Sequence, residues 1–354
     1  MVFKKFFYCI FTLMKFVRFL LFPLALLYDL ITSIRNFFFN TGIFKETSFH
    51  MPVIVVGNLS VGGTGKTPQI EYLIRLLKDV YKVSVLSRGY KRKTKGFVLV
   101  NKKHSANDVG DEPLQYFKKF PNIKVAVDAN RVAGIHNLIK QKSPEIVLLD
   151  DAFQHRKVKG SFYILLTKYD DLFTDDFLLP TGNLRESRAG AKRADIIVVT
   201  KCPFDLKEVD KENIKGKLQQ YKKEVYFTTI SYSDKIAGSQ EVSLNELKQF
   251  EVLLITGIAN PNPLLEFLIN KEIKFTHLKF ADHHHFSMKE IEVINQKFSA
   301  INADNKLMLT TEKDYTRLSN RLKELSFLEI ETTFLEDNKQ FNKTIKSHIH
   351  KNHS

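Results

Sequence analysis

VIVVGNLSVGGTGKTPQIEYLI, residues 53 to 74, decides the fold of this chain. An uninterrupted apolar run of strand length comes first, and a turn with three glycines follows it. Beyond the turn, Ile70, Leu73, Ile74 and Leu77 recur at the spacing of one helix face. An apolar strand followed by a glycine-rich turn and a helix predicts the first β-α unit of a parallel sheet.

The turn itself, SVGGTGKT, matches the phosphate-binding pattern G-x-x-x-x-G-K-[ST] except at its first position. Its glycines can turn backbone N–H groups toward phosphate oxygens, and the following helix adds its positive end. In such a loop Lys66 reaches the β- and γ-phosphates and the Thr67 hydroxyl binds Mg²⁺. The alternative is a glycine-rich hairpin without a ligand, which the strand, GKT and helix together disfavour. The predicted nucleotide loop consists of Ser60, Val61, Gly62, Gly63, Thr64, Gly65, Lys66 and Thr67.

A metal partner for this loop is expected in PEIVLLDDAFQHR, where an apolar strand ends in Asp150 and Asp151. Carboxylates at the carboxyl end of a parallel strand face the edge of the sheet at which such folds bind ligands. The context is that of the acidic residue that holds Mg²⁺ in phosphate-loop enzymes. Solvated turn aspartates are the alternative.

Apolar runs of strand length alternate with helical segments through most of the chain, which indicates a parallel sheet covered on both faces. The fold class is therefore α/β, a P-loop NTPase-like sheet with a second, smaller α/β domain that starts near FEVLLITGIANPNPLLEFLIN. YFTTISY and FLEIETTFLE are expected to pair as a two-stranded connector. The expected divisions are a membrane-interface helical segment (1–40), the P-loop domain (41–224), the smaller domain with the connector (225–340) and a flexible basic tail (341–354).

The first forty residues are rich in Phe and Leu but are interrupted by Lys, Arg and Asp. No uncharged run approaches the roughly 20 residues that a spanning helix needs. No small-residue cleavage site follows an apolar run, so a removable signal peptide is not expected. Aromatic residues mixed with basic ones predict a segment lying in the membrane interface. The alternative is an amphipathic helix packed on the protein's own core.

The formal net charge of +15 calls for an anionic partner: nucleic acid, an anionic membrane surface or a phosphorylated substrate. The positive charge is spread along the chain and follows no nucleic-acid-binding motif, so nucleic acid is not expected. Cys9 and Cys202 match no metal or disulfide spacing, which fits a reducing, cytosolic setting. No obligate protein partner is indicated.

The order of motifs VGNLSVGGTGKTP, LSRGYKRK, VGDEPLQ, LLDDAFQHR, LPTGNLRES, GIANPNP, FADHHHF and TTEKD resembles the tetraacyldisaccharide 4'-kinase family. These are membrane-associated lipid A kinases of Gram-negative bacteria. The resemblance covers most of the chain. Ala152, Ser187 and Lys91 stand where the family usually has Gly, Pro and Gly, and none of these departures removes a reactive group.

This resemblance implies transfer of the ATP γ-phosphate, with Mg²⁺, to the 4'-hydroxyl of a tetraacyldisaccharide 1-phosphate in lipid A biosynthesis. It also implies work at the cytoplasmic face of the inner membrane, as a peripheral or monotopic protein attached through the N-terminal segment. The acyl-chain pattern of the acceptor is left open.

For the catalytic base, the resemblance implies Asp111 of GDEP, paired with His283 of DHHHF. A carboxylate can take the hydroxyl proton, and a histidine beside it can orient it and tune its pKa. Asp111 is expected in the first domain and His283 in the second, so that the pair forms when the domains close. A polar turn or a metal cluster is the alternative for DHHHF, although consecutive histidines do not face one metal on a regular element.

The resemblance adds Gln154 and Glu186 around Mg²⁺ or its waters, and Arg185 to neutralise the transferring phosphoryl group. Residues placed at the substrate or its phosphate are Arg88, Tyr90, Arg185 and His155. The motif at 311–314 receives no role. The rival interpretation is a membrane-recruited ATPase switch, whose loop needs a second lysine where this chain has Val61.

Overall fold

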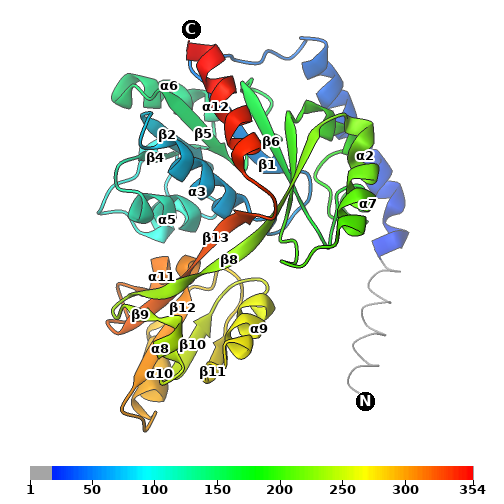
Figure 1. The fold of residues 1–354 in the computed structure, drawn as a ribbon. Coiled ribbons are helices and arrows are strands. Elements are labelled where there is room, and N and C mark those ends of the chain that lie inside the picture. Colours follow the sequence, from blue (N-terminus) through cyan, green and yellow to red (C-terminus); the bar gives the residue numbers. More distant parts are fainter. Residues whose placement is uncertain (1–17, 354) are drawn as a thin grey trace. The chain divides into compact units, whose positions relative to one another are not determined.

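The computed structural model of this chain describes residues 18–353, so expectations for residues 1–17 lie outside it. The chain forms two compact units (Figure 1). Within the described residues, unit 1 comprises residues 18–88, 130–229 and 333–353, and unit 2 comprises Gly89–Ala129 and Ile230–Thr332. Each unit is described by itself below.

Unit 1 is built on a parallel sheet whose strands β1, β5 and β7 are buried along their whole length. Such strands read as unbroken apolar runs because both of their faces are covered. The predicted P-loop NTPase-like sheet is thereby confirmed. Its strand order is β2(Val83–Ser87), β5(Ile146–Asp150), β1(Val53–Asn58), β6(Phe162–Lys168), β7(Ile196–Thr200) and the first part of β8(Glu224–Gly238).

Unit 1 also contains helices. They are α2(Phe22–Asn40), α3(Lys66–Leu77), α6(Arg131–Lys142), α7(Glu208–Leu218) and α12(Lys339–His353), with short 3-10 helices at Arg188–Arg193 and Gln219–Tyr221. The prediction of a flexible tail at 341–354 is wrong for the described residues, which form α12. Phe341, Ile345 and Ile349 are buried on one face of it, and the Phe341 ring lies 5.7 Å from that of Tyr72 on α3.

Unit 2 contains a second parallel sheet, as predicted, with apolar clusters that include Leu254 and Leu309 in one case and Leu253 and Met308 in the other. The expected pairing of YFTTISY with FLEIETTFLE is also found, since β8 lies beside β13. The sheet order is β11(Phe275–Lys279), β10(Glu251–Thr256), β12(Lys306–Thr311), β13(Leu325–Phe334) and the second part of β8, with β9(Val242–Ser243) antiparallel to β8. Its helices are α8(Leu244–Leu247), α9(Asn262–Asn270), α10(Met288–Ser299) and α11(Glu312–Leu318).

Residues 89–129 depart from the expected division, because they group with unit 2, although their two strands continue the strand order of the P-loop sheet beyond β2, as the sequence predicted. They contain α4(Ala106–Val109), α5(Asp111–Lys119), and the antiparallel strands β3(Val98–Leu99) and β4(Lys124–Val127). The reason is a set of polar contacts between α5 and α11. Lys119 forms a 2.8 Å ion pair with the largely buried Glu312, and Arg317 binds Asp111.

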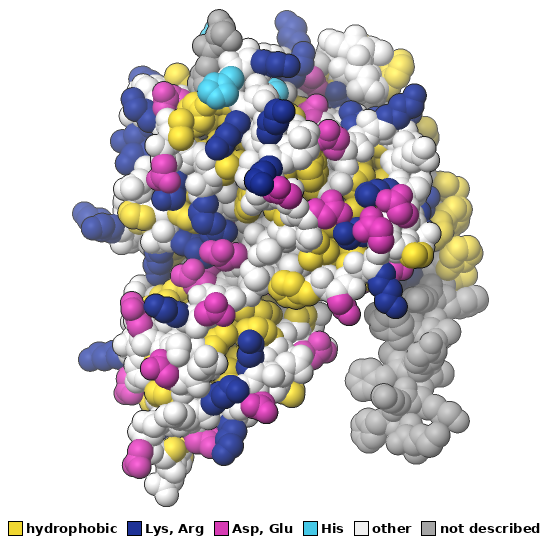
Figure 2. Space-filling model, in the orientation of Figure 1, with side chains coloured by type: hydrophobic (Ala, Val, Ile, Leu, Met, Phe, Trp, Pro, Cys, Tyr) yellow, Lys and Arg dark blue, Asp and Glu magenta, His cyan; other side chains and the backbone are white. Residues whose placement is uncertain are grey.

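Helix α2 carries a row of exposed apolar side chains on the surface of unit 1. Part of it is visible as yellow side chains next to the grey segment in Figure 2. In α2 and the residues that flank it, the exposed apolar residues are Phe19, Leu20, Leu24, Leu26, Leu27, Leu30, Ile31, Ile34, Phe37, Ile43 and Phe44. Within residues 18–353, every helix falls short of the length and apolarity needed to cross a bilayer.

Candidate active site

The glycine-rich loop of unit 1 leaves β1 at Asn58 and pairs at once with a neighbouring segment. Val61 N donates to Asn183 O at 2.8 Å, and Arg185 N donates to Leu59 O at 2.7 Å. This short extension of the sheet places Arg185 beside the loop. The local pairing therefore brings together residues more than a hundred positions apart in the sequence.

Two of the three loop glycines have a left-handed backbone conformation. Gly62 and Gly65 have φ of +104° and +81°, values that other residues adopt only with strain. Gly65 is the N-cap of α3, so the helix starts at Lys66 with its positive end at the loop. The Thr200 hydroxyl donates to Thr64 O at 2.8 Å and fixes the loop against the end of β7.

Lys66 and Arg185 share one carboxylate, that of Asp151. Lys66 Nζ lies 3.5 Å from Asp151 Oδ1, and Arg185 NH1 lies 3.2 Å from the same oxygen. Burial would raise the pKa of Asp151, but the charges of Lys66 and Arg185 and their hydrogen bonds outweigh it and lower that pKa. Asp151 is thus ionised at neutral pH and holds the two cations together at the phosphate loop.

Asp150, the last residue of β5, is buried and accepts a 3.1 Å hydrogen bond from the Ser87 hydroxyl. The part of the chain that the structure describes contains no cluster of three His, Cys, Asp or Glu suited to a metal ion. Mg²⁺, however, commonly binds through one or two carboxylates together with substrate phosphates. A hydroxyl from Thr67 in the first turn of α3 and a carboxylate from Asp150 fit that donor set.

Glu186 and Gln154, expected around the metal, have other partners in this structure. Glu186 is fully buried, and Arg193 NH2 lies 2.9 Å from both of its oxygens. Gln154 Nε2 donates to Glu186 Oε1 at 3.0 Å and to Asn58 O at 2.8 Å. Asn36 of α2 donates to Glu186 Oε2 at 3.1 Å. The carboxylate therefore joins α2 to the phosphate loop, and its oxygens bind protein donors.

His155 lies in unit 1 among basic side chains. Burial lowers its pKa to about 4, and the charges of Arg131, Lys157 and Arg88 add to the effect. Its ring is therefore neutral at physiological pH. Its Nε2 is buried and has no hydrogen-bond partner among the residues described.

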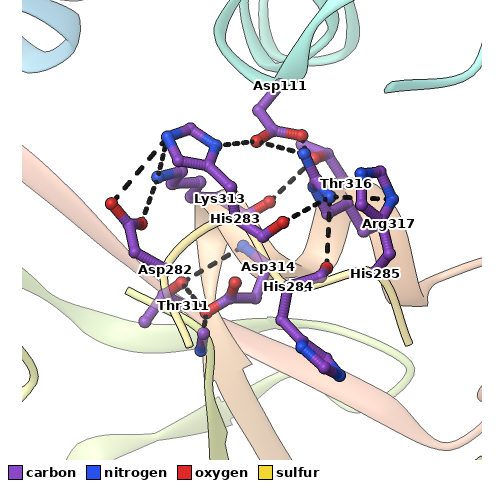
Figure 3. A network of polar contacts seen from close by, with 11 residues as sticks. Asp111, Asp282, His283, His284, His285, Thr311, Lys313, Asp314, Thr316 and Arg317 are labelled. Atoms are coloured by element: carbon purple, nitrogen blue, oxygen red, sulfur yellow. Dashed lines mark hydrogen bonds and ion pairs between the residues drawn. The ribbon is translucent and has the colours of Figure 1, made fainter. Parts of the chain in front are cut away.

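The second predicted cluster, in unit 2, brings Asp111 and His283 together (Figure 3). His283 Nδ1 lies 2.7 Å from Asp111 Oδ2. Arg317 binds the same carboxylate at two points, through Nε to Oδ1 and through NH2 to Oδ2 at 2.9 Å. Burial would raise the pKa of Asp111, but the hydrogen bonds and charges of His283 and Arg317 lower it.

The expectation that this pair joins two separate domains is wrong for the structure described. Asp111 begins α5 and His283 lies after β11, and both belong to unit 2. The pair is therefore assembled by the packing of α5 against α11 inside one unit.

The three consecutive histidines point to different partners. While His283 contacts Asp111, His284 Nε2 lies 2.9 Å from Glu290 Oε1, and His285 Nδ1 lies 3.4 Å from Arg317 NH1. Tyr90 is exposed, and its ring centre is 5.8 Å from that of His283. Arg88 belongs to unit 1, so the structure divides the predicted substrate pair between the units.

The family model for tetraacyldisaccharide-1-P 4'-kinase matches residues 17–350 of the chain. The chain belongs to this family. The tetraacyldisaccharide 4'-kinases of Flavobacterium johnsoniae and Flavobacterium psychrophilum are 53% and 54% identical to it, over 96% and 95% of this chain and 99% and 98% of theirs. The structure of LpxK from Aquifex aeolicus in complex with ATP has a TM-score of 0.76 at 32% identity, and covers 94% of this chain and 99% of that one. The resemblance carried by the motifs is thus confirmed, and the chain is a kinase of the tetraacyldisaccharide 4'-kinase family.

Sequence reasoning did not single out two basic residues of this tetraacyldisaccharide 4'-kinase family member. Lys201 follows β7, and its side chain reaches the phosphate loop at Gly63. Glycine has no Cβ, but one placed on Gly63 would lie 3.9 Å from Lys201 Nζ. Loss of surrounding water and the charges of Lys168 and Lys66 lower the pKa of Lys201. The position after an apolar strand at the ligand edge of the sheet was the available signal. Arg317 lies just beyond the motif at 311–314 and had no such signal.

Proposed function

We propose that this chain transfers the γ-phosphate of ATP to the 4'-hydroxyl of a tetraacyldisaccharide 1-phosphate. The observation that carries the proposal is the pair of cations, Lys66 and Arg185, held by Asp151 beside a glycine-rich loop in a member of this family. Phosphoryl transfer needs a phosphate cradle, charge neutralisation and a positioned acceptor, and little covalent chemistry from the protein.

The phosphates of ATP would bind at the backbone N–H groups of residues 60–67 and at the positive end of α3. Thr67 and Asp150 would hold Mg²⁺, which when bound neutralises charge on the phosphates. Phosphate oxygens compete with Asp151 for Lys66 and Arg185, because all of these are anions drawn to the same two cations. Arg185 then stabilises charge that develops on the transferring group.

The proton of the acceptor hydroxyl is taken by Asp111, with His283 orienting the carboxylate. The pKa of Asp111 is lowered, so the group is ionised and ready to accept a proton across the physiological pH range. A lowered pKa also makes it a weak base. In a loose phosphoryl-transfer transition state the attacking oxygen forms little bond to phosphorus, so a weak base is sufficient.

Arg88, Tyr90 and His155 are proposed to contact the acceptor or its 1-phosphate. Arg88 supplies a cation, and the exposed ring of Tyr90 beside His283 offers a flat apolar face for a sugar. The buried Nε2 of neutral His155, which has no partner within residues 18–353, can donate or accept one hydrogen bond according to its tautomer.

We propose attachment to the cytoplasmic face of the inner membrane through α2. Polar contacts hold the opposite side of α2 to the protein, among them Tyr28 to Arg185 O at 2.8 Å, and Arg18, just before the helix, donates to Asn183 Oδ1 at 3.0 Å. A helix held by its polar side with its apolar side exposed suits the headgroup region. The net charge of +15 favours an anionic surface, and the acceptor is itself an amphiphile.

The test is transfer from labelled ATP to a tetraacyldisaccharide 1-phosphate in detergent micelles, with wild type beside Lys66→Ala and Asp111→Ala. We expect transfer by wild type and a loss of at least about a hundredfold in both variants. Normal transfer by Asp111→Ala would support the kinase activity but would show that Asp111 is not the catalytic base. No transfer by wild type, with ATP hydrolysis stimulated by liposomes alone, would favour the ATPase switch.

A further inference from the structure

The motif at 311–314 and the residues after it have no part in the function proposed above, yet α11 supplies most of the polar contacts around Asp111 and His283 (Figure 3). Arg317 binds both oxygens of Asp111. Its NH1 also donates to the carbonyls of His283 and His284 at 3.0 and 3.1 Å. The guanidinium of Arg317 thus connects α5 to the loop that contains His283 and His284.

Lys313 acts on the other side of the imidazole. Its Nζ lies 3.1 Å from His283 Nε2 and 2.9 Å from Asp282 Oδ1. An ammonium group only donates, so a neutral His283 accepts at Nε2 and carries its proton on Nδ1. That tautomer donates to Asp111 Oδ2, which is the contact observed. Lys313 and Asp111 therefore select the same tautomer from opposite ends of the ring.

The start of α11 is tied to the same loop. The Thr311 hydroxyl accepts from Asp314 N at 3.2 Å and donates to Asp314 Oδ2 at 2.8 Å. Gly257 N donates to Asp314 Oδ2 at 2.8 Å, and Gly257 O accepts from His283 N at 3.2 Å. Thr311 and Asp314 thus fix the helix against the segment on which His283 lies.

We propose that Arg317 and Lys313 are positioning residues of the phosphoryl transfer: Arg317 holds Asp111 in place as a carboxylate, and Lys313 holds His283 in its Nδ1-protonated form. This rests on the proposed function, in which Asp111 takes the acceptor proton. The two residues act through Asp111 and His283 and need not touch substrate. The motif at 311–314 fixes the start of α11 and so sets the positions of Lys313 and Arg317.

The proposal makes a specific claim about pH. Burial of Asp111 persists without Arg317, whereas two hydrogen bonds and a positive charge are lost, so the pKa of Asp111 rises. Activity that needs the carboxylate is lost as pH falls through that pKa, so the acid limb of the pH profile moves to higher pH. The other titratable or charged groups near the pair are Asp282, His285, Lys313 and Asp314, with Tyr90, Lys91 and Lys93 from the preceding segment.

The first experiment measures kcat/KM for the lipid acceptor against pH, at saturating ATP, in wild type, Arg317→Met and Arg317→Lys. We expect the acid limb to move up by about one pH unit or more in Arg317→Met and by less in Arg317→Lys, which keeps the charge. Arg321→Met is the matched control, because Arg321 binds the Phe286 carbonyl of the same loop. Its acid limb should coincide with that of wild type.

If Arg317→Met lost the same fraction of activity at every pH and the acid limb of its pH profile did not move, Arg317 would have only a structural role. That result would overturn the proposal. If Arg317→Met does not fold, Arg317→Lys decides by the same criterion. Absence of transfer by wild type would instead overturn the proposed function, so the two failures are distinguishable.

The tautomer of His283 is tested separately by nitrogen-15 NMR of histidine-labelled protein, with the His283 signal assigned by its absence in His283→Gln. We expect a protonated Nδ1 in wild type, and a shift toward a tautomer mixture in Lys313→Met. A protonated Nε2 in wild type, or an unchanged tautomer in Lys313→Met, would overturn the role of Lys313.

Discussion

At the scale of single residues, the phosphate loop could be predicted because its chemistry is local. Gly62, Gly65, Lys66 and Thr67 lie within six positions, and the backbone conformation and helix start follow from those residue types alone. Arg317 and Lys201 could not be predicted in this way. Lys201 offers only its position after an apolar strand as a signal, and Arg317 offers none, so the role of each follows from the tertiary contacts that surround it.

Lys201 gives a prediction at this scale. Lys201→Ala should raise KM for ATP roughly tenfold with a smaller effect on kcat, because a cation beside Gly63 of the phosphate loop would be lost. ATP titration at saturating acceptor measures it. Lys207→Ala removes the same charge from the exposed N-cap of α7 and should leave KM unchanged. Equal KM values for Lys201→Ala and wild type would exclude Lys201 from the nucleotide site.

At the scale of elements, strands were easier to predict than the last helix. Unbroken apolar runs such as IVLLD need little context to indicate a buried strand, and β5 follows that run. In α12 the apolar residues stand four apart among Lys, His and Asn, so the stripe is narrow and the segment has the composition of a solvated tail. Its burial depends on the ring of Tyr72 on α3 and on Phe162 of β6, whose ring centre is 4.9 Å from that of His348.

If α12 is part of the core of unit 1, Phe341→Ala should lower the free energy of unfolding by about 3–5 kcal/mol. Phe341 is fully buried against Tyr72 and Tyr226, so truncation leaves a cavity. Urea unfolding followed by circular dichroism measures the change. Lys346→Ala, an exposed change on the same helix, should lie within about 0.5 kcal/mol of wild type. If the free energy of unfolding of Phe341→Ala also lay within about 0.5 kcal/mol of wild type, α12 would not be part of the core.

At the scale of the whole molecule, the sequence predicted two α/β units but not the membership of residues 89–129. That segment follows β2 and precedes α6, and its short apolar runs do continue the first sheet as β4 and β3. Its helix α5, in contrast, packs on α11 of unit 2. Contacts between Lys119 and Glu312 and between Asp111 and Arg317 group it with unit 2, and they join positions 193 and 206 residues apart. Periodicity, which is a local property, carries no information about such pairs.

Membrane attachment is the last prediction, and it concerns the whole molecule because two properties of α2 act together. Its outer side exposes Leu27 and Ile31 at 54% and 58%, while its inner side binds the active-site segment through Tyr28 and Asn36. The double variant Leu27→Asn/Ile31→Asn should therefore lose flotation with anionic vesicles and keep its transfer rate in detergent micelles, since the inner contacts remain. Each buried apolar side chain contributes about 1.5–3 kcal/mol, so partitioning of the double variant onto the vesicles should fall at least tenfold.

The control is Ile139→Asn, an exposed apolar change on α6, which should float with the vesicles like wild type. Undiminished flotation of the double variant would place the membrane contact elsewhere, whereas a parallel loss of activity in micelles would show that the outer face also maintains the site.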